Sequence, residues 1–160
     1  MWYLRYFFVL LHMVDDFFDK LDKQLEREEL HFAAQAGKLS EVEVLLKKGR
    51  AVNVFDDLQK TPLHYAAEGE HIEVVKFLLS HGADVNAHNE KQIGNTALRE
   101  VAATCSLEMA QILIDAGANP TIPGWAAMSA LDLAKKRKNG DGPKVYALLL
   151  EAAQRFTKKI

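Results

Sequence analysis

The chain has 160 residues, of which 49% are hydrophobic and 26% are charged, and its formal net charge is −2. This length accommodates one or at most two domains, and the slightly acidic balance argues against a general nucleic-acid-binding protein, which is usually strongly basic. Cys105 is the only cysteine, so no disulfide can form within the chain. Because this is typical of a reducing compartment, we expect a cytoplasmic protein.

Residues 1–25 differ in composition from the rest of the chain. They begin with an almost wholly apolar stretch, MWYLRYFFVLLHMV, and continue with the amphipathic stretch DDFFDKLDKQL. Arg5, His12, Asp16, Asp19 and Lys23 recur at steps of seven, four, three and four residues, which places them on one side of a helix. The segment therefore predicts an amphipathic helix, and its apolar run is shorter than the roughly 18 residues that a membrane span needs.

A pattern of helical stretches repeats from residue 26 onward. The segment LHYAA at 63–67 follows LHFAA at 30–34 by 33 residues, and further copies occupy 96–119 and 129–150. In each copy the apolar residues have helical spacing, and a glycine follows the second apolar stretch in the first three copies, where helices commonly end. The pattern predicts stacked helix–turn–helix units.

The clearest copy, residues 61–87, reads TPLHYAAEGEHIEVVKFLLSHGADVNA and resembles an ankyrin repeat in both motif and period. The resemblance implies an all-α solenoid of four repeats (26–55, 56–88, 89–121 and 122–153) with β-turn finger loops and a C-terminal tail at 154–160. Since the end of a solenoid exposes core, we expect residues 1–25 to form a capping helix packed on the first repeat. A membrane or partner contact through residues 2–14, and a secretory signal or anchor, are the alternatives.

The repeats depart from the family pattern at several positions. Glu28 and Glu29 replace the Thr-Pro that usually begins the first helix, so this helix could continue the N-terminal one. Glu70 stands where a turn glycine is expected; a positive φ there would be strained, and a turn shifted by one residue is the alternative. Arg99 replaces the motif histidine, and the finger before it is two residues longer than the previous one. Loops that outgrow a repeat often lie on the binding face.

The histidines and the cysteine, which are candidate catalytic or metal-binding residues, are scattered along the chain. His31 and His64 occupy the motif histidine position, which the resemblance implies is structural. No spacing of His and Cys offers the four ligands of a zinc site, and Cys105 has no nearby histidine in the sequence. No phosphate-binding glycine loop or nucleophile elbow occurs. We therefore expect a protein that is not an enzyme and has no cofactor or metal.

The resemblance implies that partner contacts lie on the fingers and on the inner surface of the first helix of each repeat. The matching finger positions are Phe55, Asp57, Leu58, Lys60, His88, Gln92, Ile93, Asn95, Trp125 and Met128. The matching inner-helix positions are Tyr65, Glu68, Glu100, Ala103 and Thr104. Apolar residues at fingers indicate an interface if they are exposed. The alternative is that Phe55 and Trp125 fold back and cover the edge of the stack.

These features predict a non-catalytic protein–protein interaction module that binds, and inhibits or sequesters, one specific protein partner through its concave face. An immunity-type protein that neutralises a toxin enzyme and a regulator of signalling or transcription factors are narrower versions. A membrane-associated adaptor using the aromatic N-terminal segment is the alternative from another class. Whether the chain is a monomer or a dimer is left open by the sequence.

Overall fold

The computed structural model describes residues 2–89 and 94–157, apart from the side chains of residues 2–12, 15, 16, 22, 23, 26 and 27. Within this part of the chain the regular structure is entirely helical. The elements are α1 (Trp2–Gln35), α2 (Leu39–Lys47), α3 (Pro62–Glu68), α4 (Ile72–Ser80), α5 (Ala97–Val101), α6 (Leu107–Asp115), the 3₁₀ turn η2 (Trp125–Ala127), α7 (Ala130–Lys136) and α8 (Gly142–Thr157).

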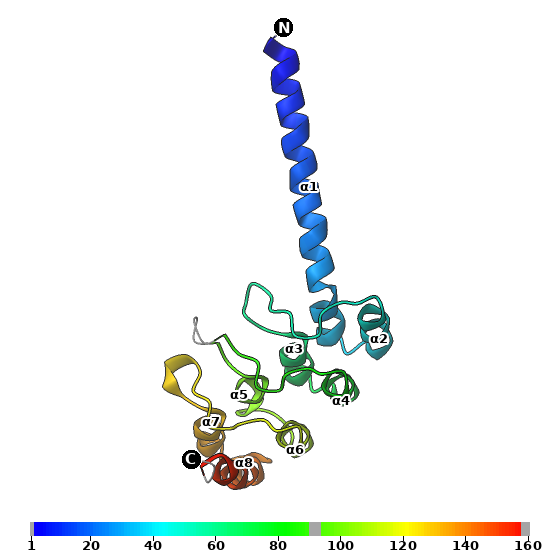
Figure 1. Ribbon diagram of the computed structural model, residues 1–160. Coiled ribbons are helices and arrows are strands. Elements are labelled where there is room, and N and C mark those ends of the chain that lie inside the picture. The colour runs from blue at the N-terminus through cyan, green and yellow to red at the C-terminus, as the bar shows by residue number, and fades with distance from the viewer. Residues whose placement is uncertain (1, 90–93, 158–160) are drawn as a thin grey trace.

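The helices form four stacked pairs, which are the C-terminal end of α1 with α2, then α3 with α4, α5 with α6, and α7 with α8. Figure 1 shows α3, α5 and α7 in one row and α2, α4, α6 and α8 in a second row beside it. The loops that connect successive pairs extend on the side of α3, α5 and α7. This is the architecture of a helical solenoid, as the repeated pattern predicts.

One continuous core runs through the stack. Leu45, Leu78, Leu113 and Leu149 contribute one buried side chain from the second helix of each pair. Alanines at the motif positions allow the first helices to approach one another closely, and Ala66 has no exposed surface. Burying a leucine side chain contributes about 1.5–3 kcal/mol, so the regular recurrence of this position stabilises the whole stack.

Side chains also join each repeat to the next through hydrogen bonds. Asn53 donates to the carbonyl of Gly82 (3.0 Å) and accepts from the N–H of Asp84 (2.8 Å). Asn86, one period later, donates to the carbonyl of Gly117 (3.0 Å) and accepts from the N–H of Asn119 (2.7 Å). These contacts fix the spacing of the loops that carry the candidate binding residues.

The turn in the second repeat lies at Glu70 itself. Glu70 has a φ of +55°, so the turn is not shifted to Gly69. Its carboxylate accepts hydrogen bonds from the backbone N–H (2.9 Å) and the hydroxyl (2.6 Å) of Ser106, the residue that caps α6. The side chain thus links the second repeat to the third, and a glycine at this position would lose that link.

Helix α1 is continuous from the N-terminal segment into the first repeat. Only its last turns, with Leu30, Ala33 and Ala34 buried, pack against the stack. The rest projects from it (Figure 1), and the whole helix of 34 residues is about 51 Å long by the usual rise per residue. This differs from the packed cap expected from the sequence. The physical reason is that residues 2–35 contain no proline or glycine to break the helix, so it continues along its own axis. Among the described residues, no helix is long and apolar enough to cross a membrane.

Candidate partner-binding surface

We define the concave surface as the exposed side of α3, α5 and α7 together with three loops, the first finger (49–60), the second finger (82–95) and the third finger (117–128). In the second finger, residues 90–93 lie outside the described part. Backbone hydrogen bonds close each finger, among them Asp56 N–H to the Lys60 carbonyl (3.0 Å), Gly94 to Asn89 (2.8 Å) and Gly124 to Met128 (3.1 Å). The first and third fingers are therefore defined turns.

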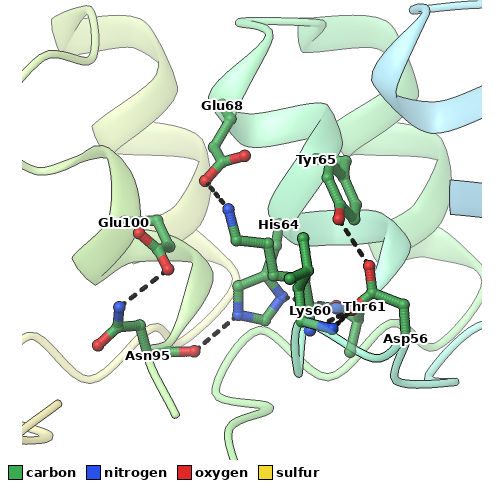
Figure 2. A network of polar contacts seen from close by, with 9 residues as sticks. Asp56, Lys60, Thr61, His64, Tyr65, Glu68, Asn95 and Glu100 are labelled. Carbon is green, nitrogen blue, oxygen red and sulfur yellow. Dashed lines mark hydrogen bonds and ion pairs between the residues drawn. The ribbon is translucent and has the colours of Figure 1, made fainter. Parts of the chain in front are cut away.

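The motif histidine His64 holds the second finger against α3. Its Nδ1 accepts from the N–H of Thr61 (3.1 Å), and its Nε2 donates to the carbonyl of Asn95 (2.7 Å; Figure 2). Burial lowers the pKa of His64, and the hydrogen bond to Asn95 opposes this effect only in part. The neutral ring suits this arrangement because it has one donor and one acceptor nitrogen. His31 bonds similarly through Nε2 to the carbonyl of Val54 (3.0 Å).

Arg99 takes the place of the motif histidine for the third finger. Its buried guanidinium donates from Nε to the carbonyl of Met128 and from Nη2 to that of Trp125, both at 2.8 Å. The longer side chain reaches both ends of the η2 turn, which one imidazole nitrogen could not do. Gly124 lies against this side chain, and a Cβ there would come within 2.5 Å of the Arg99 Cδ. Arg99 and Gly124 thus form a matched pair that shapes the third finger.

Asp56 organises the first finger. Its Oδ1 accepts from the backbone N–H groups of Leu58 and Lys60 (both 2.9 Å), and its Oδ2 accepts from the Tyr65 hydroxyl (2.6 Å; Figure 2). Burial raises the pKa of Tyr65, as does this bond, so the phenol remains a donor. Leu58 is left at the tip with 72% of its surface exposed. Sequence reasoning missed Asp56, although an aspartate before a tight turn is a known signal for such bonding.

The three fingers are joined to one another. The Asn89 amide donates to the side-chain oxygen of Gln59, which links the second finger to the first. Asn95 accepts from the N–H of Trp125 (3.0 Å) and donates to Glu100 (2.9 Å), which links the second finger to the third and to α5. Because these bonds form without a partner, they hold the described parts of the three fingers in place before binding, and less ordering entropy is lost there when a partner docks.

The concave surface near the first finger is acidic. Lys60 forms an ion pair with Glu68 and lies 5.4 Å from the centre of the Tyr65 ring (Figure 2). A groove of about 340 Å³ opens between α1 and the first finger. Its lining includes Glu28, Phe32, Asp56, Asp57, Leu58 and Tyr65. This groove combines three carboxylates with three apolar or aromatic side chains, a lining suited to a basic side chain with apolar neighbours.

The structure brings together only some of the predicted site residues. Asp57, Leu58, Lys60, Tyr65 and Glu68 surround the first finger and α3, with Asn95 and Glu100 beside them. Phe55 and His88 are half-buried and line a separate groove of about 270 Å³. Trp125 is 70% exposed, and Met128 beside it is half-buried. Ala103 and Thr104 are exposed beyond the end of α5. Gln92 and Ile93 lie outside the described residues.

The sequence analysis also missed Phe32. This residue lies one 33-residue period before Tyr65, on the same face of the first helix of its repeat, and 53% of its surface is exposed. The period itself could have identified it, because Tyr65 was matched to the inner-helix position. Phe32 extends the apolar part of the groove towards α1.

Cys105 is buried at the turn after α5, where burial raises the pKa of its thiol to about 11. The thiol is therefore protonated at neutral pH, and a protonated thiol is a poor nucleophile. Among the described residues, no three His, Cys, Asp or Glu side chains come together in a geometry that could hold a metal ion.

The fold and this surface define a helical-repeat solenoid with ordered finger loops. A family model of ankyrin repeats, in three copies, matches residues 7–89 and 30–124. The chain belongs to the ankyrin repeat family, as its motifs predict, and is accordingly a protein–protein interaction module. The pair α7–α8 continues the stack beyond the matched residues. No curated protein is significantly similar to the chain.

Proposed function

We propose that the chain binds one specific protein partner through its concave surface and blocks or sequesters that partner. The observation that carries the proposal is the pair of exposed apolar side chains, Leu58 and Trp125, at the tips of two fingers that are fixed by internal hydrogen bonds. Large apolar and aromatic side chains on an ordered surface are typical binding anchors.

The chemistry of the groove indicates the kind of residue that the partner contributes. An arginine side chain could pair with Asp57 or Glu28, which at present contact the Gln24 amide (3.4 and 3.1 Å). Its planar guanidinium could stack on Phe32 or Tyr65. The partner surface is thus expected to carry a basic residue with apolar neighbours that cover Leu58. Such a contact is steered by charge, so its association rate falls as the salt concentration rises.

The proposal is tested by affinity capture from the source cell with three forms of the full chain. The test variant carries Leu58→Ala and Trp125→Ala. The matched control carries Val44→Ala and Leu150→Ala, which remove exposed apolar side chains from α2 and α8 in the other row. We expect one dominant protein to be captured by the wild type and the control and lost with the test variant. Equal capture by all three forms would contradict a concave binding site.

An immunity-type inhibitor is a narrower form of the same proposal, and the acidic groove favours it. Enzymes that act on nucleic acids bind phosphate with basic residues, and such an active site would complement Glu28, Asp56 and Asp57. If the captured protein is such an enzyme, adding the chain in equimolar amount should abolish its activity, and the Leu58/Trp125 variant should not. Full activity in the saturated complex would exclude inhibition and leave sequestration without active-site blocking.

A further inference from the structure

The projecting part of α1 carries an unpaired apolar stripe with the spacing of a coiled coil. Val14, Phe18, Leu21 and Leu25 follow one another at steps of four, three and four residues, and each is between 41% and 55% exposed. In the sequence, Leu4, Phe7 and Leu11 precede them in the same register. The average step of 3.5 residues, sustained from residue 4 to 25, is the heptad repeat that pairs two helices.

The stripe lies on a different side of α1 from the residues that bury it most deeply against the stack, and its register continues with Glu28 and Phe32, which line the groove beside the first finger. Leu30 and Ala34, which bury α1 against the stack, lie about 160° around the helix from Val14. The side of the helix opposite the stripe continues with polar residues, among them Asp19 and Lys20, which are exposed. Room for a second helix along the stripe therefore ends near Gln24, which contacts Asp57 of the first finger, and up to that point α1 has the amphipathic form of one strand of a coiled coil.

We propose that a second copy of this chain covers the stripe, and that the two α1 helices pair in parallel over residues 4–25. The charge pattern selects the parallel orientation. Within residues 4–25, positions 8, 15 and 22, which flank one side of the stripe, are Phe, Asp and Asp, whereas positions 10, 17 and 24 on the other side are Leu, Phe and Gln. Parallel helices place each acid opposite a neutral residue of the partner, whereas antiparallel helices place acids opposite acids.

The structure also sets where the pairing ends. The next position of the heptad after Leu25 is Glu28, which lines the groove beside the first finger. Two glutamates facing each other there would repel, and Gln24 already contacts Asp57 of that finger. The paired segment thus ends at Leu25. The two stacks then lie at the same end of the coiled coil, each with its groove next to the dimer axis.

The buried area is sufficient for a stable dimer. The seven stripe residues and Phe17 would each bury on the order of 80–100 Å², about half of the surface of a large apolar side chain. The total for both chains is on the order of 1,400 Å², within the range of specific interfaces. A membrane surface fits less well, because residues 15–22 contain four aspartates and one lysine, and helices that lie on membranes are usually rich in basic residues.

The proposal is tested by sedimentation equilibrium of the full chain and of two variants. Phe18→Glu with Leu21→Glu places charges within the stripe. Met13→Glu is the matched control, because Met13 is an exposed apolar residue of the same helix that lies outside the stripe. The wild type and the control should have twice the 18.0 kDa mass of one chain, and the stripe variant the mass of one chain. The proposal would be overturned if the wild type remained monomeric as its concentration was raised in 10-fold steps. It would also be overturned if the stripe variant stayed dimeric.

Two further measurements test the orientation and the membrane alternative. Leu21→Cys should form a disulfide between chains on mild oxidation, because residue 21 faces its counterpart only in parallel pairing; a dimer that does not cross-link would overturn the parallel orientation. Flotation with vesicles of neutral and anionic lipids should leave the wild type unbound. If the wild type bound vesicles, and Met13→Glu and the stripe variant both bound them less, the helix would be assigned to a membrane instead. The stripe variant leaves the concave surface intact, so it should still capture the protein partner as a monomer. This capture experiment therefore tests the concave binding site separately from dimer formation.

Discussion

Replacing Glu70 tests whether its side chain compensates for its strained backbone. With a φ of +55°, a residue other than glycine is destabilised by about 1–2 kcal/mol. In return, its carboxylate accepts two hydrogen bonds from Ser106, at 2.9 and 2.6 Å. At this exposed position each bond contributes about 1 kcal/mol, the typical net value for a hydrogen bond, because solvent screens the charge of the carboxylate. The two effects are similar in size and opposite in sign.

Two substitutions separate these effects. Glu70→Ala keeps the strain and loses both bonds, so we expect the free energy of unfolding to fall by about 2 kcal/mol. Glu70→Gly loses the same bonds but removes the strain, so the net loss should be only about 1 kcal/mol. In a Ser106→Ala background, Glu70→Ala should be less damaging by about 1 kcal/mol, because the hydroxyl partner is already absent.

Urea unfolding followed by circular dichroism at 222 nm measures these differences, provided that the slope of the free energy with urea is the same for all variants. The ranking wild type, then Glu70→Gly, then Glu70→Ala is the expected result. If Glu70→Gly were more stable than the wild type by the full strain of about 1–2 kcal/mol, the bonds to Ser106 would contribute nothing. If the glycine and alanine variants were equally stable, the backbone at residue 70 would not be strained.

Three further predictions concern buried polar groups. Arg99→Ala should lower the free energy of unfolding by about 2–3 kcal/mol, since two finger carbonyls lose a charged donor, and should speed amide exchange at 124–129; unchanged exchange would contradict its role. Because burial lowers the pKa of His64 below 6.5, the unfolded chain binds its proton more readily, so the melting temperature should fall as pH drops below 6.5. His64→Asn should lack that dependence, and an equally steep fall in the variant would assign it elsewhere. Cys105, whose thiol pKa burial raises to about 11, should react with a thiol reagent only after unfolding; rapid native labelling would contradict this.

The sequence predicts the fold because its main determinant is periodic. Recurrence of the LHYAA motif and of the second apolar stretch places a leucine or an alanine at the same core position in successive repeats, and packing follows from that recurrence. The family and the all-helical fold are therefore confirmed. The turn at Glu70 could not be decided, because the stabilising partner, Ser106, lies a full repeat away in the sequence.

The details of the binding surface depend on side-chain contacts that motif matching does not include. Asp56 acts through its bonds to Leu58, Lys60 and Tyr65, and only the structure shows that one carboxylate serves all three. Phe55 is half-buried although its repeat position predicts exposure. The continuity of α1 with the first repeat follows from Glu28 and Glu29 and from the lack of proline and glycine in residues 2–35, whereas its projection from the stack differs from the packed cap expected.

The central claim, recognition of a protein by the concave surface, is tested most directly by amide hydrogen exchange of the chain with and without its captured partner. The account predicts slower exchange in the first finger, the third finger and α3 on binding, with α2, α4, α6 and α8 unchanged. Protection confined to the row of α2, α4, α6 and α8 would contradict it and place the partner on the opposite side of the stack.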